Sequence, residues 1–227
     1  MNSIRWSKVK AILAGGTVLG LGAAVTLAAW TDNEWVFGGS GSGDGTEPNT
    51  PGTGIYQMQQ NTWTGAAGIA SWSDQPDANG GALTFTVDPG KLVPGKTVYS
   101  PMQLRTVVES EALEVSLAEG IQSVLNKGTD TNSTDLYDAL TYGVHIGVEK
   151  APCEAGDFSG GTELVPEGSA LNVTSADTFA LAAWPDAATE PTPANICFAL
   201  TLPSTASSTL QGLNTVPVWR FTSSVGQ

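Results

Sequence analysis

Residues 196–202 have the sequence Ile-Cys-Phe-Ala-Leu-Thr-Leu, in which Ile, Phe and the two Leu residues occupy every second position. Side chains of a β-strand alternate between its two faces, so this pattern predicts a strand with one buried face. The same alternation occurs at residues 83–87, 113–117 and 142–148. We expect further strands at residues 55–60, 98–108, 178–183 and 216–222.

Eight or nine strands with one apolar face each need a second sheet to cover that face. This predicts an all-β fold, an antiparallel β-sandwich of immunoglobulin or jelly-roll type, and periodicity alone does not choose between the two strand orders. Turn sequences such as Asn-Gly-Gly at 79–81 and Asp-Pro-Gly at 88–90 separate the expected strands. The only predicted helix in this part of the chain covers residues 133–140, with Ser133 or Thr134 as N-cap.

The composition favours short strands and an acidic surface. Only 14% of the 227 residues are charged, whereas Gly and Pro contribute 27 and 13 residues. Three of the nine basic residues lie before residue 11, which leaves six basic against 22 acidic residues, a net charge of −16. Such a charge repels phosphate groups, so we expect no nucleic-acid partner and no anionic membrane surface.

The first 28 residues have the three parts of a signal peptide. Arg5, Lys8 and Lys10 precede an uncharged run at residues 11–29, and small residues at 26–28 suit cleavage next to Ala28 and Ala29. The alternative is a membrane anchor, because 19 residues just span a bilayer. The run is mostly Gly and Ala and gains little in lipid, so cleavage is favoured and no membrane contact is expected afterwards.

The sequence around the cleavage site carries a family resemblance. Residues 28–35, Ala-Ala-Trp-Thr-Asp-Asn-Glu-Trp, place an aromatic and then acidic residues after the small pair. They resemble exported proteins processed by SipW-type signal peptidases, the family of the biofilm fibre protein TasA and of camelysin. Leu92-Val-Pro-Gly-Lys96 is similar to the Leu-x-Pro-Gly turn of this family, and the C-terminal half looks most like its actinobacterial branch.

This resemblance implies a jelly-roll-like sandwich with an N-terminal signal helix and a SipW-type signal peptidase as partner during export. It also implies a secreted protein of the cell surface, extracellular matrix or biofilm. The domain boundaries that we predict are 1–28 for the signal peptide, 29–54 for an arm and linker, and 55–227 for the sandwich.

Residues 38–54 contain no large apolar side chain and predict a flexible tether. The arm before them, residues 29–37, holds Trp30, Trp35 and Phe37. Such an arm either folds back on its own domain or docks on a neighbour, and the pattern favours neither alternative.

Export predicts a disulfide between the two cysteines, Cys153 and Cys197. His145 is the only histidine, and the alternation directs it away from the core face, toward solvent. One exposed histidine supports neither a catalytic triad nor a zinc site, and a His-Glu-x-x-His pair is excluded. We therefore expect no metal and no cofactor.

Carboxylates provide no clear catalytic pair. Glu109 and Glu111, and Asp135 and Asp138, are close in sequence but border turns, where solvated surface is expected. Trp63 and Trp72 lie in a segment of weak pattern and either contact a glycan or cap the ends of the core.

Two function classes follow. The first is a non-catalytic, secreted structural protein that forms fibres with itself, the arm at 29–37 of one copy completing a sheet of the next. The second is a secreted glycan- or protein-binding module that uses Trp63 and Trp72. A hydrolase is the least supported class, so we predict that the chain is not an enzyme.

Overall fold

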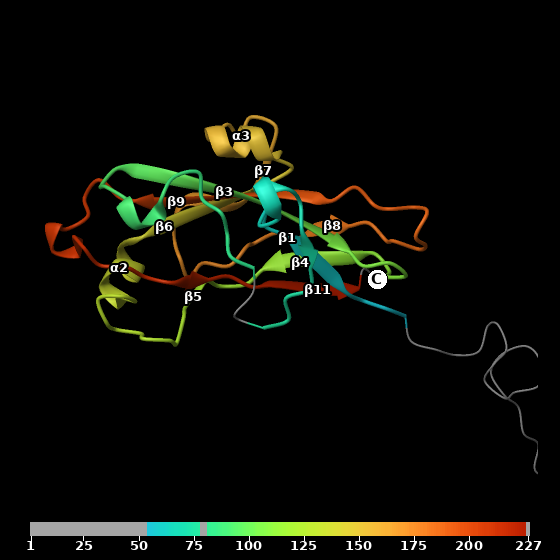
Figure 1. The fold of residues 1–227 in the computed structure, drawn as a ribbon, viewed down its shortest axis with the longest axis horizontal. Helices are drawn as coiled ribbons and strands as arrows, with labels where there is room; N and C mark the ends of the chain where they lie inside the picture. The colour runs from blue at the N-terminus through green and yellow to red at the C-terminus, as the bar shows by residue number, and fades with distance from the viewer. Residues whose placement is uncertain (1–53, 78–80, 226–227) are drawn as a thin grey trace, which may run out of the picture. The chain divides into compact units, whose positions relative to one another are not determined.

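The computed structural model describes residues 54–77 and 81–225. These residues form an antiparallel β-sandwich with few helices, which confirms the predicted fold class (Figure 1). The predicted signal helix, the cleavage site at Ala28 and Ala29, and the arm with Trp30, Trp35 and Phe37 lie outside the described residues.

One layer is a six-stranded sheet in the order β2-β1-β3-β9-β6-β7, in which all neighbours are antiparallel. Its strands are β1 (Met58–Asn61), β2 (Trp72–Ser73), β3 (Lys96–Thr106), β6 (Thr141–Ile146), β7 (Thr162–Ala170) and β9 (Ala194–Leu202). The longest pairing joins β3 to β9, from Lys96 opposite Leu202 to Leu104 opposite Ala194.

The other layer contains a three-stranded sheet in the order β11-β4-β8 and a two-stranded sheet of β10 and β5. Its strands are β4 (Leu113–Leu117), β5 (Ile121–Gln122), β8 (Phe179–Leu181), β10 (Pro217–Val218) and β11 (Phe221–Val225).

The core lies between the layers and follows the predicted alternation. Its largest fully buried side chains are Tyr142 and Phe198 from the six-stranded sheet and Leu113 and Leu117 from β4. Burying one aliphatic or aromatic side chain contributes about 2 kcal/mol, so the matched apolar faces of the two layers are the main source of stability.

Short helices connect the strands. Helix α2 (Thr134–Ala139) begins as predicted, because the Leu136 backbone N–H donates to Ser133 Oγ at 3.2 Å. The sequence pattern does not predict helix α3 (Lys150–Ala155). The 3₁₀ turns are η1 (Ala66–Gly68), η2 (Pro89–Lys91) and η3 (Ser208–Leu210).

The predicted turn at 92–96 leads directly into β3. The Lys96 backbone N–H donates to the Val93 carbonyl at 3.1 Å, and Gly95 has a φ of +81°. Proline followed by a residue of positive φ is the pattern of a type II turn. The Pro94-Gly95 pair therefore sets the start of the longest strand.

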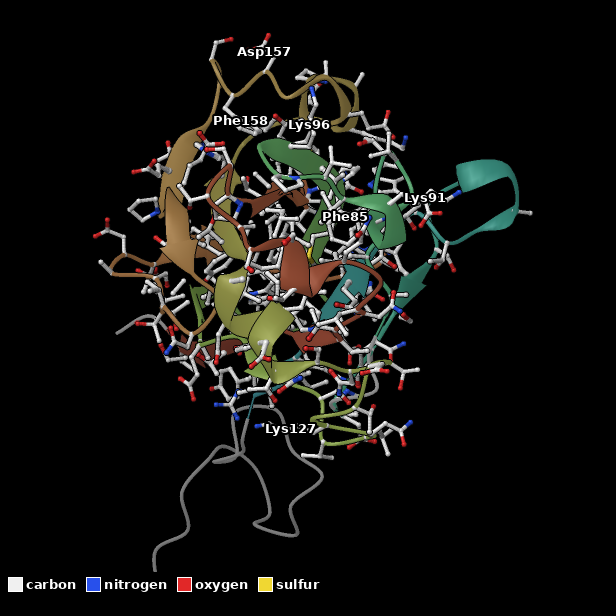
Figure 2. The ribbon with its side chains drawn as sticks, turned by 90° about the vertical axis from the view of Figure 1, so that its left-hand side faces the viewer. Phe85, Lys91, Lys96, Lys127, Asp157 and Phe158 are labelled. Atoms are coloured by element: carbon white, nitrogen blue, oxygen red, sulfur yellow. A yellow bond between two sulfur atoms is a disulfide. The ribbon has the colours of Figure 1, made fainter. Side chains whose placement is uncertain are left out.

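Three expected strands differ from the structure. Residues 83–87 form no strand, although Leu83 and Phe85 still pack against the core (Figure 2 labels Phe85). Residues 55–60 contribute only the start of β1, and the expected strand at 216–222 is two strands, β10 and β11. Alternation thus locates the buried face more reliably than the hydrogen-bonded ladder.

No helix among residues 54–77 and 81–225 combines the length and the apolar character that crossing a bilayer would require.

Candidate functional site

Strands β4 and β5 form one long antiparallel ribbon with β11 and β10. The pairing runs from Leu113 opposite Val225 to Leu117 opposite Phe221, shifts by one residue, and continues to Gln122 opposite Pro217. β8 hydrogen-bonds to β4 on the side away from β11. On the other side of the ribbon β11 is the edge strand.

The β11 edge, residues 221–225, lacks the features that usually protect an edge strand. Its sequence Phe-Thr-Ser-Ser-Val contains no charge and no proline, and its last four residues are exposed. Natural edges are commonly protected by charged residues, proline, bulges or short length. β11 therefore presents backbone groups on which another strand can pair.

The other sheet edges of the described residues are protected. β7 carries Glu163, Pro166 and Glu167, and its pairing with β6 has two register shifts. The other edge strands are short: β2, β5 and β10 have two residues each and β8 has three. Among these edges β11 is thus the best acceptor for a further strand.

The tryptophans proposed as glycan contacts are half-buried, and a cation covers each ring. The Arg105 guanidinium carbon lies 3.9 Å from the ring centroid of Trp72 and 4.7 Å from that of Trp184. Lys150 Nζ lies 5.7 Å from the ring centroid of Trp63. Cation–π contacts of this kind stabilise by about 1 kcal/mol each.

We call Arg105, Trp72, Trp184 and Glu190 the Arg105 cluster. The Arg105 guanidinium also forms an ion pair with the Glu190 carboxylate. The cluster joins β2, β3 and the segment between β8 and β9, which are distant in sequence. This arrangement favours the core-capping interpretation of Trp72. Sequence reasoning missed Arg105 and Trp184 because the stack forms only in the folded sheet.

The predicted disulfide is present between Cys153 of α3 and Cys197 of β9, with Cα atoms 5.6 Å apart and both residues fully buried. It holds α3 against the outer face of the six-stranded sheet. Gly156 ends α3 at a φ of +71°, where a Cβ would lie 2.7 Å from the Tyr99 ring. A glycine is required there for both conformation and space.

The expected exposure of His145 is wrong. Only 8% of this residue is accessible, and its ring stacks on Phe158 with centroids 4.1 Å apart and an interplanar angle of 11°. His145 does point away from the sandwich core, but Phe158 in the segment after α3 covers it. Within the described residues His145 Nε2 has no hydrogen-bond partner.

The carboxylates considered as an acid–base pair lie on the surface of the described residues. Glu109, Glu111, Asp135 and Asp138 are all exposed, as expected for solvated carboxylates. No three His, Cys, Asp or Glu side chains of residues 54–77 and 81–225 are grouped as metal ligands.

A shallow depression of about 290 Å³ lies beside α3, between residues 147–152 and 157–160. Its Asp157 accepts hydrogen bonds from Ser159, chiefly from the backbone N–H, which lowers the pKa of this carboxyl group. Glu149, which also lines the depression, is exposed like Asp157.

No family model, curated protein or solved structure matches this chain.

Proposed function

We propose that this chain is an exported, non-catalytic structural protein of the cell surface or extracellular matrix that assembles with itself. In the assembly, the arm at residues 29–37 of one copy pairs with the β11 edge of the next copy. The observation that carries the proposal is the unprotected edge of β11. Adding a strand there satisfies backbone N–H and C=O groups that otherwise bond only to water.

Two further features support export and assembly. The buried Cys153–Cys197 disulfide suits an oxidising compartment outside the cytoplasm. The arm supplies Trp30, Trp35 and Phe37, and the Gly-rich residues that follow give it reach. A SipW-type signal peptidase is the proposed processing partner.

The experiment removes donor and acceptor separately. Deleting residues 29–37 should leave the domain folded by circular dichroism and should remove every contact made by strand donation, so that light scattering shows smaller assemblies than in the full chain. Ser224→Lys should have the same effect, because it places a charge on the edge while facing Glu114 across the ribbon.

The matched control is Thr162→Lys on the protected β7 edge, which should assemble like the wild type. Fibres or oligomers that persist unchanged in the deletion variant, in electron micrographs and light scattering, would rule out strand donation by the arm.

A further inference from the structure

The loop after β5 displays a cluster of aliphatic side chains to solvent. Val124 is 83% exposed and Leu125 is 67% exposed, and Ile121 and Val216 are also exposed. Ile121 lies opposite Val218, which makes it a diagonal neighbour of Val216 on the same face of the ribbon. We call these four residues the loop patch.

The loop patch is held in place by a buried amide. Asn132 Nδ2 donates to the carbonyls of Ser123 and Leu125, both at 2.8 Å. Its Oδ1 accepts from Gln122 Nε2 at 3.0 Å and from the Val216 backbone N–H at 3.1 Å. A loop fixed by four such bonds presents its apolar tip at little further cost in entropy, which suits a docking surface.

A second exposed apolar cluster lies where β1 and β4 begin. Ile55, Tyr56 and Val108 are all exposed, and we call them the turn patch. The Glu111 backbone N–H donates to the Ile55 carbonyl at 3.0 Å, which brings the chain around residue 55 against the turn at 108–110. The exposed carboxylates of Glu109 and Glu111 border this patch.

The two patches lie at opposite ends of the same ribbon. β4 and β5 run from Leu113, beside the turn patch, to Gln122, beside the loop patch. An extended chain rises about 3.3 Å per residue, so the ribbon separates the patches by roughly 30 Å. Figure 1 shows β4 and β11 at the end where β1 enters, and β5 and α2 toward the other end.

The charges beside the patches are complementary. Lys91, Arg105 and Lys150 form ion pairs, whereas Lys127, two residues after Leu125, forms none within the described residues. Figure 2 shows Lys127 projecting from the periphery of the domain. Asp130 follows in the same loop, and Glu109 and Glu111 follow Val108 of the turn patch. An approaching loop patch would therefore bring Lys127 toward Glu109 and Glu111.

We infer that the loop patch of one copy docks on the turn patch of a second copy of this chain, so that the domains associate head to tail. Two different surfaces that meet in this way do not close on themselves, and repetition gives an open filament. This contact joins folded domains and does not need residues 29–37. It is therefore separate from strand donation.

The test uses two variants, each of which inactivates one end. Leu125→Asp removes the loop patch and Tyr56→Asp removes the turn patch. Both are made in the chain lacking residues 29–37, where strand donation is eliminated, and then in the full chain. Sedimentation velocity across a concentration series should show association at least tenfold weaker for each variant alone.

Mixing the two variants provides the decisive measurement. The intact turn patch of Leu125→Asp can meet the intact loop patch of Tyr56→Asp, so in the chain lacking residues 29–37 an equimolar mixture should form heterodimers and nothing larger. Ile69→Asp, at a 64% exposed aliphatic residue outside both patches, is the control and should associate like its parent.

Three results would overturn the inference. A mixture that stays monomeric excludes head-to-tail docking. Loss of association with Leu125→Asp but not with Tyr56→Asp means that loop patches meet each other. Binding of wild-type protein to phosphatidylcholine vesicles, lost in Leu125→Asp while association is unchanged, assigns the loop patch to a lipid surface.

A charge exchange tests the orientation independently. Lys127→Glu and Glu111→Lys should each weaken association, because each places like charges across the contact. The double variant should restore association, because the two exchanged charges are again of opposite sign where neighbouring copies meet. A double variant that associates no better than the single variants would contradict this orientation.

Discussion

The Tyr142 hydroxyl donates a hydrogen bond to the backbone carbonyl of Val173, 31 residues further along the chain. Tyr142 is 1% exposed, and its ring stacks on Trp219 with centroids 5.7 Å apart. One side chain of β6 thus joins the turn after β7 to the segment between β10 and β11. The neutral phenol is the form that this site stabilises.

Stability should therefore fall at alkaline pH through Tyr142. Burial, and secondarily the nearby Tyr137, raises the pKa of Tyr142 to about 12, from about 10 in an unfolded chain. Its contribution is complete below pH 10 and is lost as the pH rises toward 12, on the order of 2 kcal/mol. Denaturant unfolding at intervals from pH 8 to 12 should show a shallower decline in Tyr142→Phe. Equal slopes in both proteins would contradict this assignment.

Removing the disulfide should destabilise the domain without changing its fold. The bond closes a loop with a sequence separation of 44 residues. In the chain-entropy model such a loop contributes about 4 kcal/mol, so Cys153→Ala/Cys197→Ala should lower the free energy of unfolding by about this amount. Because both cysteines are fully buried, dithiothreitol should reduce the wild type quickly only in denaturant. Rapid reduction under native conditions, detected by alkylation and mass spectrometry, would contradict the close packing of α3 on the sheet.

Local patterns predict the central strands and α2 correctly. Apolar residues at every second position identify β4, β6 and β9, because each has one face on the core. Ser133 can be identified as the N-cap of α2 because its hydroxyl accepts a hydrogen bond from Leu136, three residues along the same segment. The pairing of Cys153 with Cys197 follows from their number and the predicted compartment.

Tertiary contacts explain what the sequence does not predict. Helix α3 has six residues, includes Pro152, and buries only Cys153, so no apolar period reveals it. Its position depends on the disulfide and on contact with the sheet. For the same reason His145 is covered: alternation shows which face a residue occupies, but not that a later loop packs on that face. The Arg105 cluster likewise joins residues from three distant segments.

The imidazole of His145 should be replaceable at no cost. Its buried Nε2 lacks a partner in the described residues, and an unsatisfied buried polar atom is destabilising. His145→Phe keeps a flat ring against Phe158 and should leave the melting temperature equal or higher. Phe158→Ala should instead lower the free energy of unfolding by about 3 kcal/mol, because it uncovers both His145 and Tyr99. A marked loss in His145→Phe would indicate a bonding role for the imidazole.

The planar guanidinium of Arg105 should stabilise the domain by stacking on tryptophan rings as well as by its charge. Arg105→Lys keeps the charge but cannot stack between Trp72 and Trp184, so the free energy of unfolding should fall by about 1–2 kcal/mol. The near-ultraviolet circular dichroism of the tryptophans should change as well. Arg220→Lys, at an exposed residue, is the matched control. Trp72→Ala should also destabilise; a variant that instead lost glycan binding at full stability would favour a binding module.

Asn132 should connect the stability of the domain to its assembly. Asn132 is 1% exposed, and its amide nitrogen donates to two backbone carbonyls. A carboxylate of the same shape cannot donate to either carbonyl. Asn132→Asp therefore loses both bonds and buries a charge against two carbonyl oxygens, which should lower the free energy of unfolding by about 3 kcal/mol. Asn214→Asp adds the same charge at an exposed position and should change stability little.

Below the unfolding transition, Asn132→Asp should also show faster amide exchange at residues 123–126 and weaker association, because Val124 and Leu125 lose their fixed position. If the protein associated as strongly as the wild type while these amides exchanged faster, the loop patch could not be the docking surface.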